Sequence, residues 1–186
     1  MTKEEVRMFL SSIENIRDKT MFTLMYSYGL RAEETRRLKI GRITLDKRNT
    51  KDSIMIEAVK GGKSGIHSIN TDIAKLLRKY FKTLDSLEED SPLFSSRKKK
   101  GHLSTAQIAR LFKKHAEDLD LPEYLKHPHT LRHSIAVHLA EIGADVAHVQ
   151  DHLRHTRIES TLVYFQITNE NRRKFQDVAF NKLNIN

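Results

Sequence analysis

The segment 127–134 concentrates side chains that could do chemistry. It reads His-Pro-His-Thr-Leu-Arg-His-Ser, so His129 and Arg132 are three residues apart, directly after Pro128. If a helix begins at Thr130 or just before it, both side chains lie on the same side of its first turn. A helix N-terminus adds unpaired N–H groups and partial positive charge. Together these groups predict an anion site, and the anion we expect is a phosphate.

Two residues further along the chain add a different chemical capability. His155 follows Leu153 and Arg154, and Tyr164 comes nine residues after His155. An imidazole can transfer a proton, and a phenol can act as a nucleophile. These two side chains, together with a phosphate site, point to phosphoryl transfer rather than to a simple anion clamp.

Helices must position most of these groups, because apolar residues recur at helical spacing through most of the chain. The predicted helices run over about 2–13, 18–28, 32–39, 71–84, 104–112, 130–142 and 145–153, followed by a short helix that carries Tyr164 and an amphipathic segment over 169–186. Capping boxes are predicted at 2–5, 104–107 and 156–159, and Thr71 is the predicted N-cap of its helix.

Over residues 43–70, the apolar residues no longer recur at helical spacing. Residues 43–45, 53–59 and 65–70 predict three short strands. Lys-Gly-Gly-Lys at 60–63 is the predicted turn between the last two, because paired glycines allow the positive φ values of a tight hairpin. The turn would project Lys60 and Lys63 from a small antiparallel sheet, although lysines are also commonplace at solvated hairpin tips.

Composition and charge narrow the class of protein. The 186 residues fit one domain, and 33 Lys and Arg against 24 Asp and Glu give a net charge of +9. Such a charge is typical of nucleic-acid binders, although alone it fits a merely soluble basic protein as well. The absence of cysteine excludes disulfides and thiolate metal sites. No apolar run reaches membrane-span length and no signal peptide is visible, so we expect a cytoplasmic protein, or a nuclear one in a cell with a nucleus.

Five motifs together resemble those of the tyrosine recombinases, the phage-integrase and Xer-type family. They are Gly-Leu-Arg-Ala-Glu-Glu at 29–34, Lys-Gly-Gly-Lys at 60–63, His-Thr-Leu-Arg-His-Ser at 129–134, Leu-Arg-His at 153–155 and Tyr164. The resemblance covers about residues 2 to 180 and is most specific over 130–164. It implies a mainly α fold with a small three-stranded antiparallel β-sheet.

The resemblance also implies an active site and a function. The implied catalytic residues are Arg31, Lys60, His129, Arg132, His155 and Tyr164, with Glu34 in support and Lys63 as the second choice for the hairpin lysine. The implied function is site-specific recombination or integration, in which DNA strands are cut and rejoined through a covalent 3′-phosphotyrosine, without metal, ATP or another cofactor. The expected partners are double-stranded DNA and further copies of the chain, forming a tetramer on DNA with residues 170–186 as a link between protomers. Lower-ranked DNA contacts are Lys63, Arg97, Lys98, Lys99, Lys100 and Arg154.

Two features depart from the family pattern. The family usually has Leu-Gly-His where this chain has Leu153-Arg154-His155, which puts the local backbone in doubt. Most relatives also carry an N-terminal helical DNA-binding domain. We therefore expect 1–186 to be a single catalytic domain, either a naturally short protein or a catalytic fragment.

Three other functions compete with this interpretation. The i, i+4 pairs His129/His133 and His148/His152 have zinc-helix spacing, but the His-Glu-x-x-His form is missing and Arg132 would lie beside the ion, so we expect no metal site. A catalytically silent DNA-binding module would keep the fold without the chemistry. A type IB topoisomerase would share the chemistry, and DNA relaxation would separate it from a recombinase.

Overall fold

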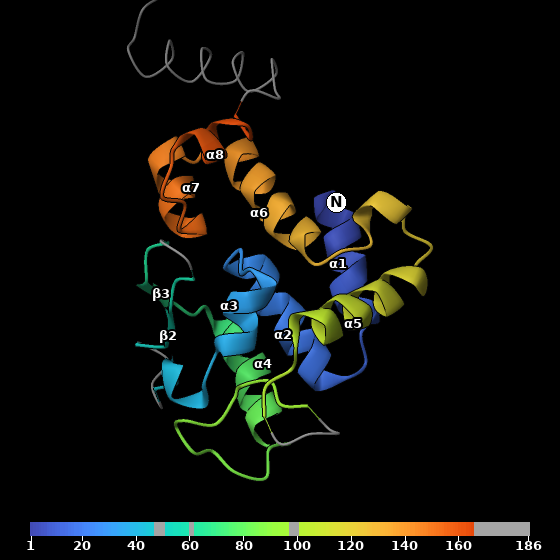
Figure 1. The fold of residues 1–186 in the computed structure, drawn as a ribbon, viewed down its shortest axis with the longest axis vertical. Coiled ribbons are helices and arrows are strands. Elements are labelled where there is room, and N and C mark those ends of the chain that lie inside the picture. Colours follow the sequence, from blue (N-terminus) through green and yellow to red (C-terminus); the bar gives the residue numbers. More distant parts are fainter. Residues whose placement is uncertain (47–50, 60–61, 97–100, 166–186) are drawn as a thin grey trace, which may run out of the picture.

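The computed structural model describes residues 1–46, 51–59, 62–96 and 101–165 (Figure 1). These ranges contain α1 (Lys3–Ser12), α2 (Ile16–Ser27), α3 (Ala32–Arg37), α4 (Thr71–Phe81), α5 (Thr105–Glu117), α6 (His129–Glu141), α7 (Val146–Leu153) and α8 (Glu159–Leu162). Short 3-10 turns occupy Ile40–Arg42 and Glu123–Leu125. The mainly helical fold is therefore confirmed. None of the helices in the described ranges is long and apolar enough to cross a membrane.

Two of the predicted capping boxes are present. The Thr2 hydroxyl accepts a hydrogen bond from the Glu5 backbone N–H, and the Glu5 carboxylate accepts one from the Thr2 N–H. Ser104 and Gln107 make the same reciprocal pair at the start of α5. Each box satisfies N–H groups that the helix itself leaves unpaired, so these two starts are fixed by local sequence.

Two other predicted helix starts are wrong. The N-cap of α4 is Asn70 rather than Thr71, because the Asn70 side-chain oxygen accepts from the Ile73 N–H at 2.9 Å. The predicted box at 156–159 does not form, and α8 begins after Ile158 without a side-chain cap. α8 also ends before Tyr164, which therefore lies just beyond the short helix that was predicted to carry it.

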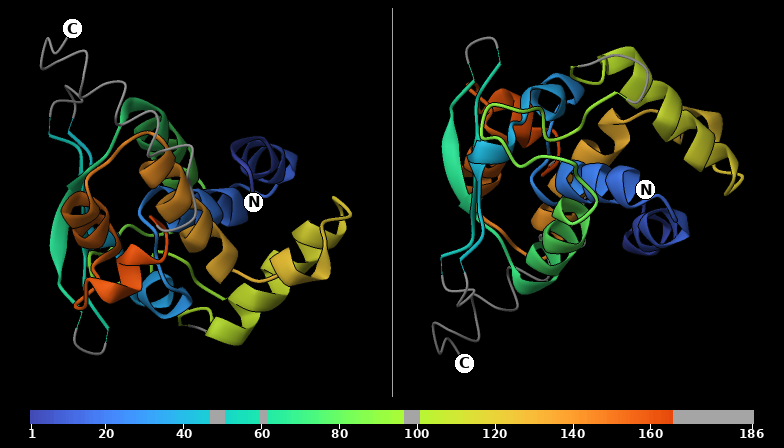
Figure 2. Two further views of the ribbon diagram at one scale, coloured as in Figure 1. Left: turned by 90° about the horizontal axis from the view of Figure 1, so that it is seen from above. Right: turned by 90° about the horizontal axis from the view of Figure 1, so that it is seen from below.

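The sheet is small and antiparallel throughout. β1 (Ile43–Thr44), β2 (Ser53–Ile56) and β3 (Gly65–Ser68) lie in the order β1-β2-β3, and Ile54 is opposite His67. The strands are shorter than predicted, because pairing ends at Ile56 and Gly65, before the hairpin turn. Residues 60–61 of that turn lie outside the described residues. Figure 2 shows the sheet along one edge of the helices, with α7 and α8 on the same side.

Two hydrophobic clusters hold these elements in place. The larger one joins α1, α2, α4 and α5 to the sheet, and Phe112 packs 4.7 Å from the Phe9 ring and 5.4 Å from the Phe22 ring. The smaller one joins α6 and α7 through side chains that include Leu153 and Tyr164. Burying each large apolar side chain contributes roughly 1.5–3 kcal/mol. α6 contacts both α2 and α7, so it links the α2–α3 turn to the segment that ends at Tyr164.

Candidate active site

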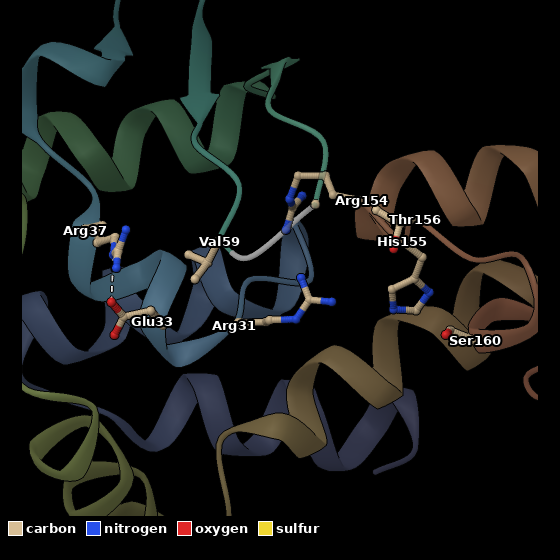
Figure 3. A pocket seen from close by; sticks show the side chains of 9 residues that line it. Arg31, Glu33, Arg37, Val59, Arg154, His155, Thr156 and Ser160 are labelled. Atoms are coloured by element: carbon tan, nitrogen blue, oxygen red, sulfur yellow. Dashed lines mark hydrogen bonds and ion pairs between the residues drawn. The ribbon is translucent and has the colours of Figure 1, made fainter.

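Three parts of the chain line a cavity of about 680 Å³. The start and the body of α3 and the segment that follows α7 contribute polar side chains, and the β2–β3 hairpin contributes Val59 and Gly62. Figure 3 shows Arg31 and His155 pointing toward one another across this space. The lining residues are Arg31, Glu33, Arg37, Val59, Gly62, Arg154, His155, Thr156 and Ser160.

Arg31 is positioned by the turn between α2 and α3. Gly29 has a φ of 56°, a value that favours glycine, and a Cβ at this position would lie 2.6 Å from a Leu153 methyl carbon, which would have to shift. Arg31 is the N-cap of α3, and its N–H donates to the Glu34 carboxylate at 2.8 Å. Its guanidinium pairs with the same carboxylate at 3.0 Å while its side chain stays 37% exposed. Arg31 can therefore reach a ligand in the cavity.

Arg132 is a buried cation held by main-chain carbonyls. It lies in the first turn of α6, and only 1% of its side chain is exposed. Its guanidinium donates to the Gly29 carbonyl and, at 2.6 Å, to the Leu153 carbonyl. Burial, and then the charge of Arg31, lower its pKa to about 10, which leaves it protonated at neutral pH. The predicted neighbours Arg31 and Arg132 are brought together.

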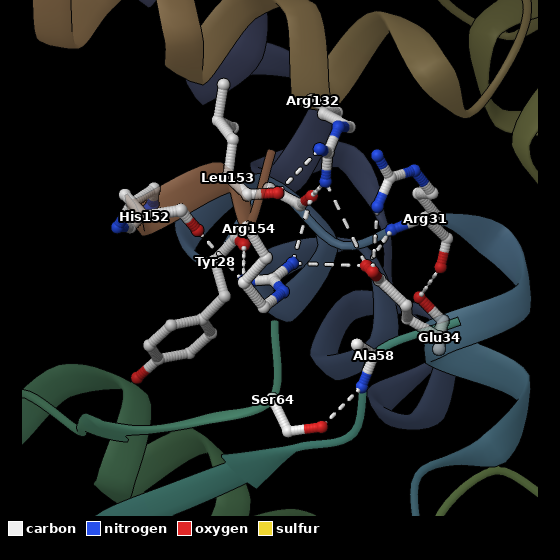
Figure 4. Close-up of polar contacts among 11 residues, drawn as sticks. Tyr28, Arg31, Glu34, Ala58, Ser64, Arg132, His152, Leu153 and Arg154 are labelled. Atoms are coloured by element: carbon white, nitrogen blue, oxygen red, sulfur yellow. Dashed lines mark hydrogen bonds and ion pairs between the residues drawn. The ribbon is translucent and has the colours of Figure 1, made fainter. Parts of the chain in front are cut away.

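Arg154 is a third guanidinium at the same place, and it is buried rather than on the surface (Figure 4). Its backbone is left-handed, with φ 57° and ψ 37°. The side chain pairs with Glu34 at 3.1 Å and donates to the carbonyls of Tyr28 at 3.0 Å and Gly29 at 3.4 Å. It also bonds its neighbour, the His152 carbonyl, at 2.9 Å. The doubt about the backbone at Leu-Arg-His is resolved in favour of a conformation that glycine adopts more easily.

Glu34 is the common partner of these cations. Its buried carboxylate lies 3.0 Å from Arg31, 3.1 Å from Arg154 and 3.9 Å from Arg132. Burial raises the pKa of Glu34, but Arg154, the Arg31 N–H and Arg132 together outweigh burial, so the pKa lies below its usual range. Three guanidiniums against one carboxylate leave an excess of two positive charges. This excess of positive charge favours the binding of an anion at the site.

His155 and His129 supply imidazoles beside the cations. His155 is buried, and its Nδ1 lies 2.9 Å from the Thr161 hydroxyl. Burial first, and then Arg132 and Arg31, lower the pKa of His155 to about 4. His129 is the exposed first residue of α6, and partial desolvation followed by Arg132 lowers its pKa as well. Both imidazoles are therefore neutral at pH 7.

Tyr164 packs against α6 near the cations of its own chain. Its side chain is buried, and its ring meets the His133 ring edge-on at a centroid distance of 5.0 Å. Burial raises the pKa of the phenol, and the opposing attraction of Arg132 and Arg31 does not cancel that rise. The phenol is therefore protonated at neutral pH and needs a base in order to attack.

Several predicted site residues cannot be placed. Lys60, Arg97, Lys98, Lys99 and Lys100 lie outside the described residues, whereas Lys63 is described and exposed. Residues on both sides of the unplaced pair 60–61 line the cavity, and a Cβ on Gly62 would lie 3.5 Å from the Arg154 carbonyl oxygen. Among the described residues, no three His, Asp or Glu side chains are grouped to hold a metal ion.

Sequence reasoning missed Thr161 and the carbonyls of Tyr28, Gly29 and Leu153. Thr161 is fully buried, and its hydroxyl faces His155. Carbonyl groups leave no signal in a sequence. The only available signal for Thr161 was a polar residue close to His155 in the chain.

Comparison with known proteins now gives the family. The model of the phage integrase family matches residues 1–171. The chain belongs to this family. Tyrosine recombinase XerA of Pyrococcus horikoshii is 32% identical over 177 residues, covering 94% of this chain and 59% of the relative. Tyrosine recombinase XerC of Haemophilus ducreyi is 34% identical over 166 residues, covering 89% and 52%. The family predicted from the motifs is confirmed, and the chain spans little more than half the length of these curated relatives.

Solved structures of other tyrosine recombinases share the fold. The crystal structure of XerA recombinase has a TM-score of 0.79 at 21% identity, covering 96% of this chain and 64% of that one. XerH site-specific recombinase bound to difH substrate has a TM-score of 0.74 at 24% identity, covering 88% and 49%. The mainly helical catalytic-domain fold with its three-stranded sheet is therefore the fold of this chain.

Proposed function

We propose that this chain cuts and rejoins DNA strands through a covalent phosphotyrosine, as the catalytic domain of a site-specific recombinase. The observation that carries the proposal is the convergence of Arg31, Arg132 and His155 near Tyr164, with an excess of positive charge in the surrounding site. A scissile phosphodiester carries one negative charge, which this site would attract. Residues 1–186 act as one catalytic domain in this proposal.

The arginines stabilise the charge that develops during the reaction. At the pentacoordinate transition state, negative charge grows on the nonbridging phosphate oxygens. Guanidiniums bind such oxygens in a fixed fork and stay charged at any working pH. Arg31 reaches the cavity, and Arg132 lies behind it at the start of α6. This is the stabilisation that metal ions provide in other phosphoryl-transfer enzymes.

Tyr164 is the proposed nucleophile. A bond forms from its phenol oxygen to phosphorus, and the bond from phosphorus to the 5′-oxygen breaks. The phenol proton passes to a base. The candidate is His129, because an imidazole with a lowered pKa is neutral and can accept a proton. His155 donates its free N–H to a phosphate oxygen. Because the phosphotyrosine conserves the bond energy, the reverse attack by a 5′-hydroxyl rejoins the strand without ATP.

Lys60 is the proposed acid that protonates the leaving 5′-oxygen. The support is indirect: Val59 and Gly62, on either side of residues 60–61, line the cavity that Arg31 and His155 face. Lys63 is the alternative, since it is on the same hairpin and exposed.

The relatives favour recombination over DNA relaxation. The two relatives named above are tyrosine recombinases, and the solved neighbours include XerH with its difH substrate and the Tn1549 integrase with circular intermediate DNA. These names support double-stranded DNA as the partner here. A type IB topoisomerase activity would instead appear as relaxation of supercoiled plasmid by the chain alone.

A nicked suicide duplex tests the proposed function. Cutting beside the nick releases a short strand, which diffuses away and traps the protein on DNA. The wild-type chain should form an adduct that protease removes, and Tyr164→Phe should form none because it lacks the nucleophile. His133→Phe, which keeps a ring against Tyr164, is the matched control for packing. Absence of an adduct from the wild-type chain at low salt would contradict the proposal.

We also propose that copies of the chain assemble on DNA, as a tetramer in the complete reaction, through residues 170–186. Phe175, Val178, Ala179 and Leu183 give this segment an apolar face at helical spacing. Deleting 170–186 should weaken assembly on DNA, measured by native gel shift, while the urea transition of the monomer stays cooperative. An unfolded truncated chain, or unchanged assembly, would rule out this role and favour packing on its own domain.

A further inference from the structure

Arg154 combines two features that oppose one another. Its backbone is left-handed, a conformation that glycine adopts freely and a residue with a Cβ adopts at a cost. Its guanidinium is nevertheless buried, with four partners in contact: one carboxylate and three carbonyls. Both terminal nitrogens of the guanidinium are engaged, whereas its buried Nε has no hydrogen-bond partner among the described residues. A left-handed backbone beneath a buried side chain with these contacts indicates that the contacts of the two terminal nitrogens hold the local conformation.

The partners of Arg154 are also the partners of the other two arginines. The Gly29 carbonyl accepts hydrogen bonds from both Arg132 and Arg154. The Glu34 oxygen that pairs with Arg154 at 3.1 Å is 3.9 Å from Arg132. Arg154 is therefore the closer partner of that oxygen, and Arg132 is held mainly by carbonyls. Figure 4 shows the three guanidiniums around this single carboxylate.

We propose that Arg154 is a positioning residue for strand cleavage: it pairs with the Glu34 oxygen that is nearest to Arg132, so that the charge of Arg132 stays available for the phosphate. The inference rests on the proposed function. Only 1% of the Arg154 side chain is exposed, so it acts through Glu34 and the carbonyls rather than by gripping DNA. Without it, Glu34 would draw in Arg132 and cancel part of the charge that faces the phosphate.

The first test is Arg154→Gly, which removes the cation and relieves the backbone. Single-turnover cleavage of the nicked duplex at saturating DNA should slow by about 10²-fold, the usual scale for losing one preorganised electrostatic group. Binding of uncleaved DNA is measured with two proteins that both carry Tyr164→Phe, one with and one without Arg154→Gly. Their dissociation constants should differ by less than about threefold, because the substitution weakens stabilisation of the transition state and not binding of the uncleaved DNA. Asp120→Gly is the matched control, since Asp120 is also left-handed but is exposed and outside the site.

The second test asks whether Glu34 is the reason for the loss. Glu34→Gln keeps an acceptor for the Arg31 N–H but removes the negative charge. If Arg154 neutralises Glu34, the double variant Arg154→Gly/Glu34→Gln should cleave about tenfold faster than Arg154→Gly alone, as expected for directly coupled residues. Arg154→Lys retains the charge that the proposal requires and loses only the planar set of guanidinium donors, so its cleavage rate should stay within about tenfold of wild type.

The outcomes separate this inference from the proposed function. If the wild-type chain forms an adduct but Arg154→Gly cleaves as fast, or loses DNA affinity instead of rate, the positioning role is overturned alone. Additive losses in the double variant would overturn it too, because a purely structural arginine predicts them. If Arg154→Gly lacks a cooperative urea transition, the test rests on Arg154→Lys, provided that this variant is folded. A loss of about 10²-fold in the cleavage rate of Arg154→Lys would overturn the proposed role of the Arg154 charge. No adduct from the wild-type chain overturns the proposed function and this inference with it.

Discussion

At the scale of single residues, His155 and Tyr164 are both neutral at pH 7, and burial is the first cause in each. Burial disfavours the charged imidazolium of His155 and the charged phenolate of Tyr164. The neighbouring arginines act in the same direction on the histidine but in the opposite direction on the phenol. A bound phosphate would cancel much of that attraction, so the phenol must lose its proton as it attacks rather than beforehand.

The hydroxyl of Thr161 should control which nitrogen of His155 carries the proton. If the hydroxyl donates to Nδ1, the proton of the neutral ring is placed on Nε2, which is then free to bond the phosphate. Thr161→Val removes that donor and should slow single-turnover cleavage by roughly tenfold, less than the ~10²–10⁴-fold of an acid–base group itself, because His155 is still present. Thr161→Ser keeps the hydroxyl and should cleave nearly as fast as wild type. Equal rates for the two variants would mean that the contact is only packing.

The proposed role of Lys60 can be separated from that of the arginines with a sulfur substitution. An alkoxide is a poor leaving group, since its conjugate acid has a pKa not far from that of water, ~15.7. A thiolate departs without help, because thiols have pKa values of ~8.5. Lys60→Ala should therefore cut ordinary DNA very slowly, and DNA with sulfur at the 5′-bridging position at nearly the wild-type rate.

Arg132→Ala and Tyr164→Phe are the controls for that experiment, and neither should be rescued. Rescue of Lys63→Ala instead would show that the other hairpin lysine is the acid. If neither lysine variant is rescued, the acid is a different group, and His129 would be tested next.

At the scale of elements, β3 meets α7 through two histidines. The rings of His67 and His152 lie edge-on at a centroid distance of 6.1 Å. The Nε2 atom of each is buried and has no hydrogen-bond partner among the described residues. This contact joins the hairpin to the helix that leads into Arg154 and His155. It is suited to neutral rings and would be disrupted by charge.

That contact should make the fold sensitive to acid. Burial, and then His67, lower the pKa of His152 from its usual 6.5 to about 4. As the pH falls from 6.5 to 4, the unfolded chain binds a proton that the folded chain excludes. The free energy of unfolding should therefore fall by up to about 1.4 kcal/mol per pH unit from this group, with no loss above pH 6.5.

Urea denaturation at pH 7 and pH 5 measures this sensitivity. His152→Gln should reduce the difference between the two stabilities by about 2 kcal/mol, the product of that slope and the interval from pH 6.5 to pH 5 in which it applies. His148→Gln, on the exposed side of the same helix, should leave the difference unchanged. A pH difference that survives in His152→Gln would assign the acid sensitivity to other groups.

Most helices and two of the three capping boxes could be predicted from neighbouring residues, although the N-cap of α4 and the box at 156–159 were wrong. Contacts between distant residues could not be predicted. The capping boxes at Thr2 and Ser104 depend on bonds across three residues, and both are present. The family could likewise be predicted from short motifs, which contain Arg31, His129, Arg132, His155 and Tyr164 in the family's order. The burial of Arg154 depends on Glu34, 120 residues away. Arg154 was therefore predicted to be a DNA contact, because an arginine beside a phosphate site has no other partner visible in sequence.

At the scale of the whole molecule, the net charge of +9 should dominate binding to DNA. Phosphate contacts release counterions, so the logarithm of the association constant should fall linearly with the logarithm of salt concentration. For this chain alone we expect weak binding with a steep slope. Nanomolar, sequence-specific binding at physiological salt would contradict this expectation.

Substituting one exposed lysine should change that slope. Lys63→Ala should reduce it by about 1, the value for one phosphate contact. Lys3→Ala, on α1 across the molecule from β3, should leave it unchanged (Figure 1). Fluorescence anisotropy of a labelled duplex across a salt series measures both slopes. The same reduction in both variants would mean that the charge acts over the whole surface rather than at the hairpin.

The pairing of Glu34 with Arg154 has a consequence for the newly made protein. During translation, Glu34 leaves the ribosome 120 residues before its closest buried partner. At about 5–20 residues per second, that interval lasts roughly ten seconds. For most of it, the emerging chain has Arg31 and Glu34 but not Arg132, and Tyr164 follows only after Arg154. A polypeptide that has not yet reached Tyr164 therefore lacks the proposed nucleophile, so the proposed strand cleavage can begin only once the segment after α7 has been made.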